Sequence, residues 1–256
     1  MSAAPATRAE VCVVACAEAW RGDGEILASP FGVVPALGAR LARLTFEPDL
    51  VLTDGEAALM ANTPPLDATA DEAVLEAPMP YRRTFEVLWS GRRHIMMMAT
   101  QVDRHGNQNI SCIGDWARPK TQLIGVRGAP GNTVNHPTSY WVPAHSTRSF
   151  VDHVDMVCGV GYERAEKAGP GAWRFHEIRV VVSDLGVFDF DGPGRTMRLR
   201  SVHPGVSVDE VQDKTGFVLE VSDPVAETRL PTADELRLVR EVLDPAGRRD
   251  GEVPPR

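Results

Sequence analysis

The chain has 256 residues, of which 43% are hydrophobic and 24% charged, so it is long enough to bury a sizeable core as one domain. Its net charge of -8 argues against non-specific binding to nucleic acid, because affinity for phosphate backbones comes from Lys and Arg that release counterions. No run of eighteen apolar residues and no basic segment followed by an apolar core occurs, so we expect neither a membrane span nor a signal peptide. Few cysteines, without a CxxC pair, are typical of a reduced, cytoplasmic protein.

The first hundred residues predict alternating helices and strands. Apolar spacing predicts a helix, a strand, a second helix and a second strand over residues 11–19, 25–29, 35–44 and 50–53. The last three form a βαβ unit, which implies a parallel sheet with a right-handed crossover. We expect residues 62–80, which are rich in Pro, Asp and Ala, to run over the surface.

The rest of the chain predicts more short strands and two helices. β-branched and apolar runs predict strands at residues 95–100, 122–125, 154–158, 179–183 and 186–191. Helices are expected at residues 208–214 and 232–243, and the second begins with a capping box of Thr232 and Glu235. Residues 1–256 are expected to form a single domain, with a loose, charged tail at 246–256.

Polar residues follow the predicted strand at 50–53. They are Thr53, Asp54, Gly55 and Glu56. Ligands bind at the carboxyl ends of strands in parallel α/β sheets, so these side chains are candidates for a site. They also suit a tight turn followed by the start of a helix, whose positive end favours acidic residues. The residues alone leave both interpretations open.

Two later segments offer groups that could hold a ligand. Amide side chains in 101–109 lie just beyond a buried strand, where they bind a substrate carbonyl or satisfy the backbone of their own loop. The glycine-rich loop at 125–132 is either an anion nest with an arginine or an irregular structural loop. The candidate substrate-binding residues are Gln101, Asn109, Arg127, Gly128, Asn132 and Asn135. The seven histidines are dispersed, so no metal site is expected.

These segments, taken in order, resemble the β subunits of the class I CoA-transferase family. The strongest stretch, QVDRHGNQNISCIGDWARPKT at 101–121, is similar to the family pattern Q-x-D-x-x-G-N-x-N-x-x-x-I-G-D-x-x-x-P-K-T. The glycine loop and the later stretches RVVVSDLGVFDFD and HPGVSVDEVQDKTGF match in the same order, so the resemblance covers most of the chain. It implies an α/β, CoA-transferase (NagB/RpiA-like) fold with a central, mostly parallel sheet flanked by helices.

The resemblance also implies partners and a substrate class. Family members pair a homologous α subunit with the β subunit, as an α2β2 heterotetramer with the active site at the subunit interface. The substrate is an acyl-CoA, and no separate cofactor is expected because CoA is part of the substrate. In transferases of this family a glutamate of the β subunit attacks the acyl-CoA, which is nucleophilic catalysis by a carboxylate.

The chain departs from the family pattern at that nucleophile. The family's glutamate precedes a small residue and a Gly, and the matching triplet here is Thr53-Asp54-Gly55. A threonine hydroxyl cannot form the exchangeable acyl anhydride that CoA transfer requires. Glu56 would restore a carboxylate only through a slipped register. Met98 and Ala99 stand where many members have two glycines before the Gln.

The departure is similar to that of a subgroup that opens a ring of a steroid-derived CoA thioester in cholesterol catabolism. The stretches LTDGEA, VDRHGNQNIS, VRGAPGNT and NHPTSYWV carry this likeness. It implies hydrolysis of a carbon–carbon bond beside a ketone, of the retro-Claisen type, with a glutamate of the α subunit as general base. Two other hypotheses stay open: a conventional acyl-CoA:carboxylate CoA-transferase β subunit that uses Glu56 or a carboxylate of the partner, and a non-catalytic scaffold.

Overall fold

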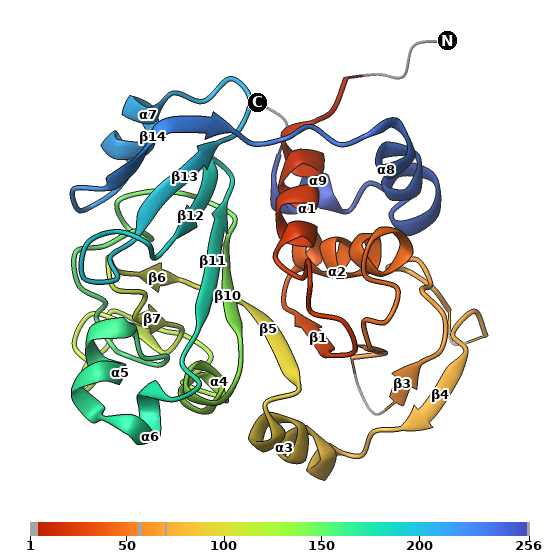
Figure 1. Cartoon of the computed structure of the whole chain (residues 1–256), viewed down its shortest axis with the longest axis horizontal. Coiled ribbons are helices and arrows are strands. Elements are labelled where there is room, and N and C mark those ends of the chain that lie inside the picture. Colours follow the sequence, from red (N-terminus) through yellow and green to blue (C-terminus); the bar gives the residue numbers. More distant parts are fainter. Residues whose placement is uncertain (1–4, 56–57, 70, 255–256) are drawn as a thin grey trace. The chain divides into compact units, whose positions relative to one another are not determined.

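The computed structural model describes residues 5–55, 58–69 and 71–254, which fall into two compact units (Figure 1). The first unit comprises Met1–Met96 together with Arg229–Arg256, and the second comprises Met97–Thr228. The sequence predicts residues 1–256 as a single domain, and that prediction covers both units.

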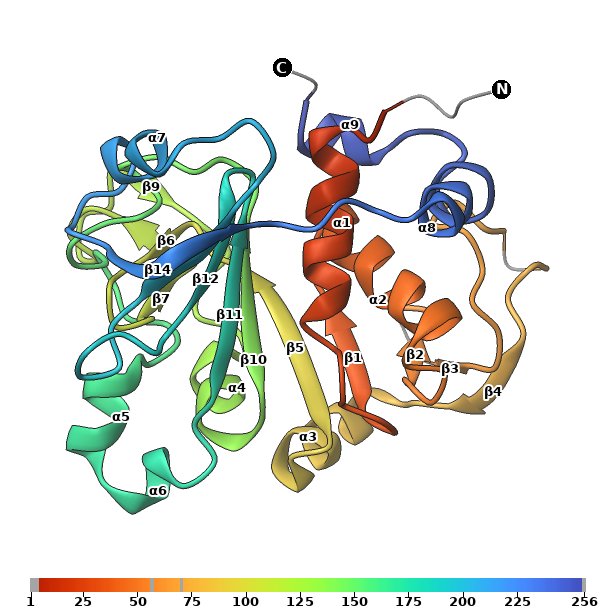
Figure 2. The same ribbon diagram turned by 45° about the horizontal axis from the view of Figure 1, so that its top comes forward.

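Two packed helices build the core of the first unit. Helix α1 (Arg8–Glu18) begins with a capping box, in which the Glu10 N–H donates to Thr7 Oγ1 and the Thr7 N–H donates to Glu10 Oε2 at 2.8 Å. Helix α2 (Val33–Thr45) lies beside α1 in both views (Figure 1, Figure 2). A Cβ at Gly38 of α2 would lie 2.9 Å from Cys16 Cβ, so only glycine allows this close approach.

The predicted βαβ unit is present in the first unit. Strand β1 (Leu27–Pro30) pairs in parallel with β5 (Arg93–Met98), and a parallel bridge joins Leu27 to Val51 at the end of the crossover. The strand that follows is shorter than expected, because β2 (Leu52–Thr53), β3 (Ala58–Met60) and β4 (Leu75–Pro78) form a separate antiparallel sheet.

Three predictions for this unit need correction. One of the two open interpretations of Thr53–Glu56 expected a helix to start there, but the next described residues, Ala58–Met60, form strand β3. The expected surface segment at 62–80 contains β4, and an unpredicted helix α3 (Tyr81–Ser90) follows it. Helix α8 (Ala233–Arg237) has the predicted capping box, but the chain then continues as a π-helical segment η1 (Leu238–Leu243).

The segment predicted as a loose tail is anchored over residues 249–253. It forms α9 (Arg249–Glu252), and the side chains of Arg249 and Val253 are buried. Arg249 Nη1 donates to Asp244 Oδ2 at 2.8 Å, and Arg249 Nη2 donates to Glu10 Oε1 at 3.1 Å. This charged residue is therefore held by buried carboxylates, one of which lies near the other end of the chain.

A mixed sheet organises the second unit. Its strands run in the order β10 (Thr138–Val142), β11 (Ile178–Ser183), β12 (Gly186–Asp189), β13 (Arg198–Val202) and β14 (Glu220–Glu227). The outer pairs β10–β11 and β13–β14 are parallel, and β12 is antiparallel to both of its neighbours. The helices of this unit are α4 (Ala129–Asn135), α5 (Tyr162–Ala168), α6 (Pro170–Trp173) and α7 (Val208–Asp213).

Two short hairpins of this unit carry the segment with the strongest family pattern. They are β6 (Gln101–Val102) with β7 (Gln108–Asn109), and β8 (Cys112–Ile113) with β9 (Thr121–Gln122). The strand predicted at 154–158 does not form; those residues are irregular. The predicted glycine loop runs directly into α4, whose first turn contains Pro130, a position that suits proline because its missing N–H is not needed there.

Candidate functional site

The residues at the family's nucleophile position form a tight turn between β2 and β3. The Gly55 N–H donates to Thr53 Oγ1 at 3.2 Å, and Gly55 has a φ of 87°. Asp54 bonds Ala58 twice: its N–H donates to Ala58 O at 3.1 Å, and its Oδ1 accepts from the Ala58 N–H at 3.0 Å. Thr53 is half-buried and Asp54 is exposed. Glu56 lies outside the described residues.

In the second unit, Gln101 and Asn109 belong to one side-chain cluster. They are directly paired across the β6–β7 hairpin, which places their side chains on one face. Asn109 Nδ2 donates to Gln101 Oε1 at 2.7 Å and to Cys112 O at 2.7 Å, while Asn109 Oδ1 accepts from the Ser111 N–H at 2.9 Å. Asn109 is fully buried, and both of its amide N–H groups are bonded within the chain. Its amide therefore satisfies the loop, as one of the two interpretations expected.

Asp155 joins this cluster from a segment that the sequence did not single out. Its N–H donates to Gln101 Oε1 at 3.0 Å, and its Oδ2 accepts from Gln101 Nε2 at 3.2 Å. The two residues are separated by 54 positions, so no local pattern could reveal the contact. The only signal within the sequence is a polar residue in a run predicted to be a buried strand.

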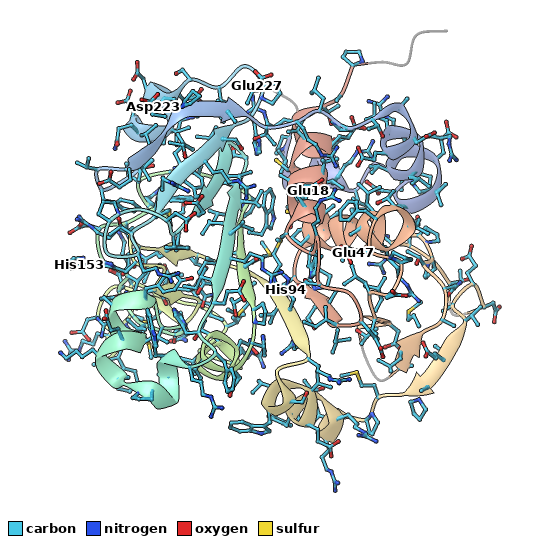
Figure 3. The ribbon with its side chains drawn as sticks, in the orientation of Figure 1. Glu18, Glu47, His94, His153, Asp223 and Glu227 are labelled. Atoms are coloured by element: carbon cyan, nitrogen blue, oxygen red, sulfur yellow. The ribbon has the colours of Figure 1, made fainter. Side chains whose placement is uncertain are left out.

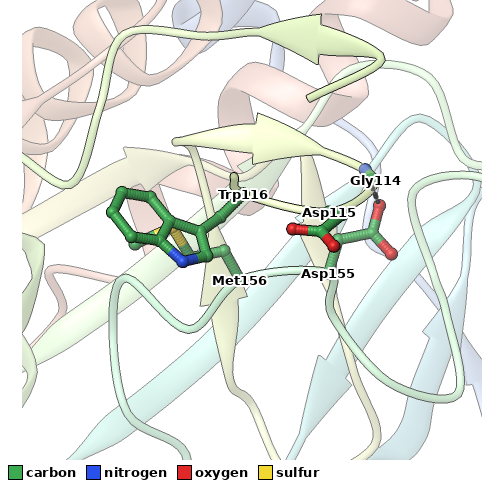
Figure 4. A pocket seen from close by; sticks show the side chains of 5 residues that line it. All are labelled: Gly114, Asp115, Trp116, Asp155 and Met156. Atoms are coloured by element: carbon green, nitrogen blue, oxygen red, sulfur yellow. Dashed lines mark hydrogen bonds between the residues drawn. The ribbon is translucent and has the colours of Figure 1, made fainter. Parts of the chain in front are cut away.

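A pocket of about 580 Å³ lies beside the cluster (Figure 4). It is lined by Gly114, Asp115, Trp116, Asp155 and Met156. The Gly114 N–H donates to Asp155 Oδ2 at 2.8 Å, so one carboxylate oxygen binds both the pocket rim and Gln101. Trp116 is 73% exposed, and its indole gives the pocket an apolar wall next to the carboxylates of Asp115 and Asp155.

The turn at 103–107, which lies within the family pattern, is held by its own side chains. Asp103 Oδ1 accepts from the backbone N–H groups of His105 and Asn107, each at 3.0 Å. Asn107 Nδ2 donates to Asp103 Oδ2 at 2.9 Å and to Glu163 Oε1 at 2.8 Å. Burial raises the pKa of Asp103, although the hydrogen bonds from Asn107 and His105 act in the opposite direction. These residues shape the loop.

The glycine-rich segment places its candidates around the start of α4. Arg127 is exposed and has a φ of 51°, and Gly128 is the N-cap residue of the helix. Asn132 is buried, with its Nδ2 3.5 Å from Met97 Sδ, and Asn135 Nδ2 donates to Gly131 O at 2.7 Å. Within this group the exposed Arg127 offers a cationic side chain to a ligand.

A buried histidine of the first unit is paired with a carboxylate of the same unit. His94 on β5, labelled in Figure 3, is fully buried. Its Nδ1 lies 2.7 Å from Asp23 Oδ2. Within residues 5–55, 58–69 and 71–254, no group of three His, Cys, Asp or Glu side chains is placed to hold a metal ion. In that part of the chain no helix is long and apolar enough to cross a membrane.

The model of the family described as Coenzyme A transferase matches residues 15–214. The chain belongs to the coenzyme A transferase family. It is 56% identical to the "Cholesterol ring-cleaving hydrolase IpdB subunit" of Rhodococcus jostii (strain RHA1), over 96% of each chain. It is 30% identical to a 3-oxoadipate CoA-transferase subunit of Pseudomonas knackmussii, over 81% of this chain and 82% of that one. Among solved structures, it matches that of Rhodococcus jostii RHA1 IpdAB with a TM-score of 0.93 and 55% identity, over 97% of this chain and 98% of the other.

These matches confirm the predicted family and fold. A coenzyme A transferase fold explains why the pattern at 101–121 and the sheet of the second unit occur together. The chain therefore has the scaffold of a CoA-thioester enzyme, with Thr53 at the position where the family pattern has its glutamate.

Proposed function

We propose that this chain is the β subunit of a two-subunit hydrolase that opens a ring of a steroid-derived CoA thioester in cholesterol catabolism. The observation that carries the proposal is the identity of 56% to the R. jostii IpdB subunit over nearly the whole of both chains. Thr53 at the nucleophile position agrees with it, because a hydroxyl does not support exchange of CoA between two acids.

A homologous α subunit completes the enzyme in this proposal, as an α2β2 heterotetramer. The solved structure of IpdAB, which this chain matches with a TM-score of 0.93, supports a partner of that kind. The general base is a glutamate of the α subunit, and no cofactor is required beyond the CoA carried by the substrate. The enzyme acts in the cytoplasm.

The reaction adds water across a carbon–carbon bond. The base takes a proton from water, and the hydroxide oxygen bonds to the carbon of a ring ketone. The bond from that carbon to the neighbouring α-carbon then breaks, its electron pair forms an enolate, and the enolate takes up a proton. Hydrogen-bond donors aimed at the developing oxyanion lower the barrier, and loss of one such donor typically reduces the rate about a hundredfold or more. From the second unit of this chain, Gln101 donates to the substrate, and Arg127 binds its anionic groups.

A conventional CoA-transferase is the second candidate, and the 30% identity to a 3-oxoadipate CoA-transferase subunit favours it. It requires a carboxylate that forms an acyl anhydride and then a glutamyl-CoA thioester. The triplet Thr53-Asp54-Gly55 does not supply one at the family position.

The test uses the chain co-purified with its α-type partner. The complex is incubated in ¹⁸O-labelled water with the CoA thioester of a ketone-bearing bicyclic acid, and the products are examined by mass spectrometry after borohydride trapping. Ring opening with one labelled oxygen and no glutamyl adduct is expected. A borohydride-trapped adduct at Glu56, with CoA passing to added carboxylic acids, would refute the hydrolase proposal.

A further inference from the structure

We propose that Asp155 is a positioning residue that fixes the amide of Gln101 for the reaction. The inference rests on the proposed function, in which Gln101 donates a hydrogen bond to the substrate. Asp155 belongs to none of the segments whose sequence pattern pointed to the site. Three hydrogen bonds to the Gln101 amide carry the inference.

The amide of Gln101 is held at both of its ends. Its Oε1 accepts two hydrogen bonds, from Asn109 Nδ2 at 2.7 Å and from the Asp155 N–H at 3.0 Å. A carbonyl oxygen has two lone pairs, so these contacts fill its acceptor capacity. Its Nε2 donates to Asp155 Oδ2 at 3.2 Å. Asp155 therefore contacts the oxygen and the nitrogen of the same amide.

These contacts allow only one orientation of the amide group. A flipped Gln101 would point its NH2 group at two N–H donors and its carbonyl oxygen at the carboxylate of Asp155. Both changes replace attraction by repulsion, so the assignment of oxygen and nitrogen follows from the network. In this orientation one Nε2–H of Gln101 donates to Asp155. The second Nε2–H has no acceptor among the described residues, so it is left for a ligand.

Asp155 is itself anchored. The Gly114 N–H donates to the same Oδ2 at 2.8 Å (Figure 4), and Gly114 has a φ of 86°, a conformation that favours glycine. The Asp155 carboxylate thus connects the β8 end to the β6–β7 hairpin. Since Gln101 is 5% exposed, its amide has little freedom once these bonds form. A donor held in this way is ready for the oxyanion without reorganisation, which is how such groups act most strongly.

Two substitutions at Asp155 separate positioning from packing. Asp155→Ala removes the acceptor for Gln101 Nε2 and for the Gly114 N–H but keeps the backbone donor. Asp155→Asn keeps a carbonyl oxygen for both donors at nearly the same size. Asp152→Ala is the matched control, because Asp152 lies in the same segment, is exposed and pairs with Arg104.

The experiment measures kcat, KM and melting temperature for the complex of this chain with its α-type partner. We expect Gln101→Ala to lower kcat about a hundredfold and Asp155→Ala about tenfold, with KM nearly unchanged. Asp155→Asn should restore kcat to within about threefold of wild type, and Asp152→Ala should leave it unchanged. The double variant Gln101→Ala/Asp155→Ala should be no slower than Gln101→Ala alone, because Asp155 acts through Gln101.

Three results would overturn the positioning role: additive effects in the double variant, an Asp155→Ala variant that melts earlier while its kcat is unchanged, and a Gln101→Ala variant with full activity. Failure of the proposed function is a separate result, because the wild-type complex would then transfer CoA to acids without opening a ring. The same comparison of variants would then be made on the transfer reaction.

Discussion

Asn109→Ala tests whether this amide is structural or binds the substrate. The change removes the acceptor of the buried Ser111 N–H, which lies 2.9 Å from Asn109 Oδ1, and the donor to Cys112 O at 2.7 Å. A buried N–H left unpaired costs about 1–3 kcal/mol, and each lost bond contributes about 1 kcal/mol more. Together with the bond to Gln101 Oε1, the free energy of unfolding should fall by about 3–5 kcal/mol.

For a chain of 256 residues, a loss of that size lowers the melting temperature on the order of 10 °C. The assay is thermal unfolding of the complex, with steady-state kinetics well below the transition. KM should change by less than about threefold, because no Asn109 N–H is left for a substrate. Asn135→Ala is the control, since the half-buried Asn135 donates to Gly131 O, and loss of that bond costs about 1 kcal/mol. A wild-type melting temperature combined with a tenfold rise in KM would show that Asn109 binds substrate and that this reasoning is wrong.

The remaining predictions concern the nucleophile position, the C-terminal anchor and a buried histidine. Thr53→Ala should retain activity within about tenfold, whereas Thr53→Glu should give a borohydride-trapped adduct; an inactive Thr53→Ala complex of normal stability would contradict this. Glu10 is buried and bonded by Arg240 and Arg249, so Glu10→Ala should cost about 3–5 kcal/mol in an unfolding assay, and a loss below about 1 kcal/mol would refute the anchor. Burial lowers the pKa of His145 to about 3, so the side chain stays neutral in the folded chain, while in the unfolded chain it takes up a proton below about pH 6.5. The free energy of unfolding should therefore fall as the pH is lowered from about 6.5 to about 3. His145→Gln should make this fall smaller when unfolding is measured across the same pH range.

The sequence alone determined the family and most of the regular elements. Helices α1, α2 and α7 and strands β5, β11 and β12 follow apolar periodicity, which depends on neighbours a few positions away. The capping box of Thr232 and Glu235 is equally local. The pattern at 101–121 also singled out the segment that holds Gln101 and Asn109, although not its hairpin.

Tertiary structure decided what those polar residues do. The sequence left open whether the amides at 101–109 face a substrate or their own loop, and the structure commits Asn109 to the loop by contacts with Ser111 and Cys112. Asp155, 54 positions from Gln101, entered the cluster only through folding. Arg249 was predicted to lie in a loose tail, yet Glu10 near the other end of the chain holds it. Local sequence patterns do not predict such pairs. A hydrogen bond or ion pair depends on the distance between two groups in space, and the packing of remote segments determines that distance.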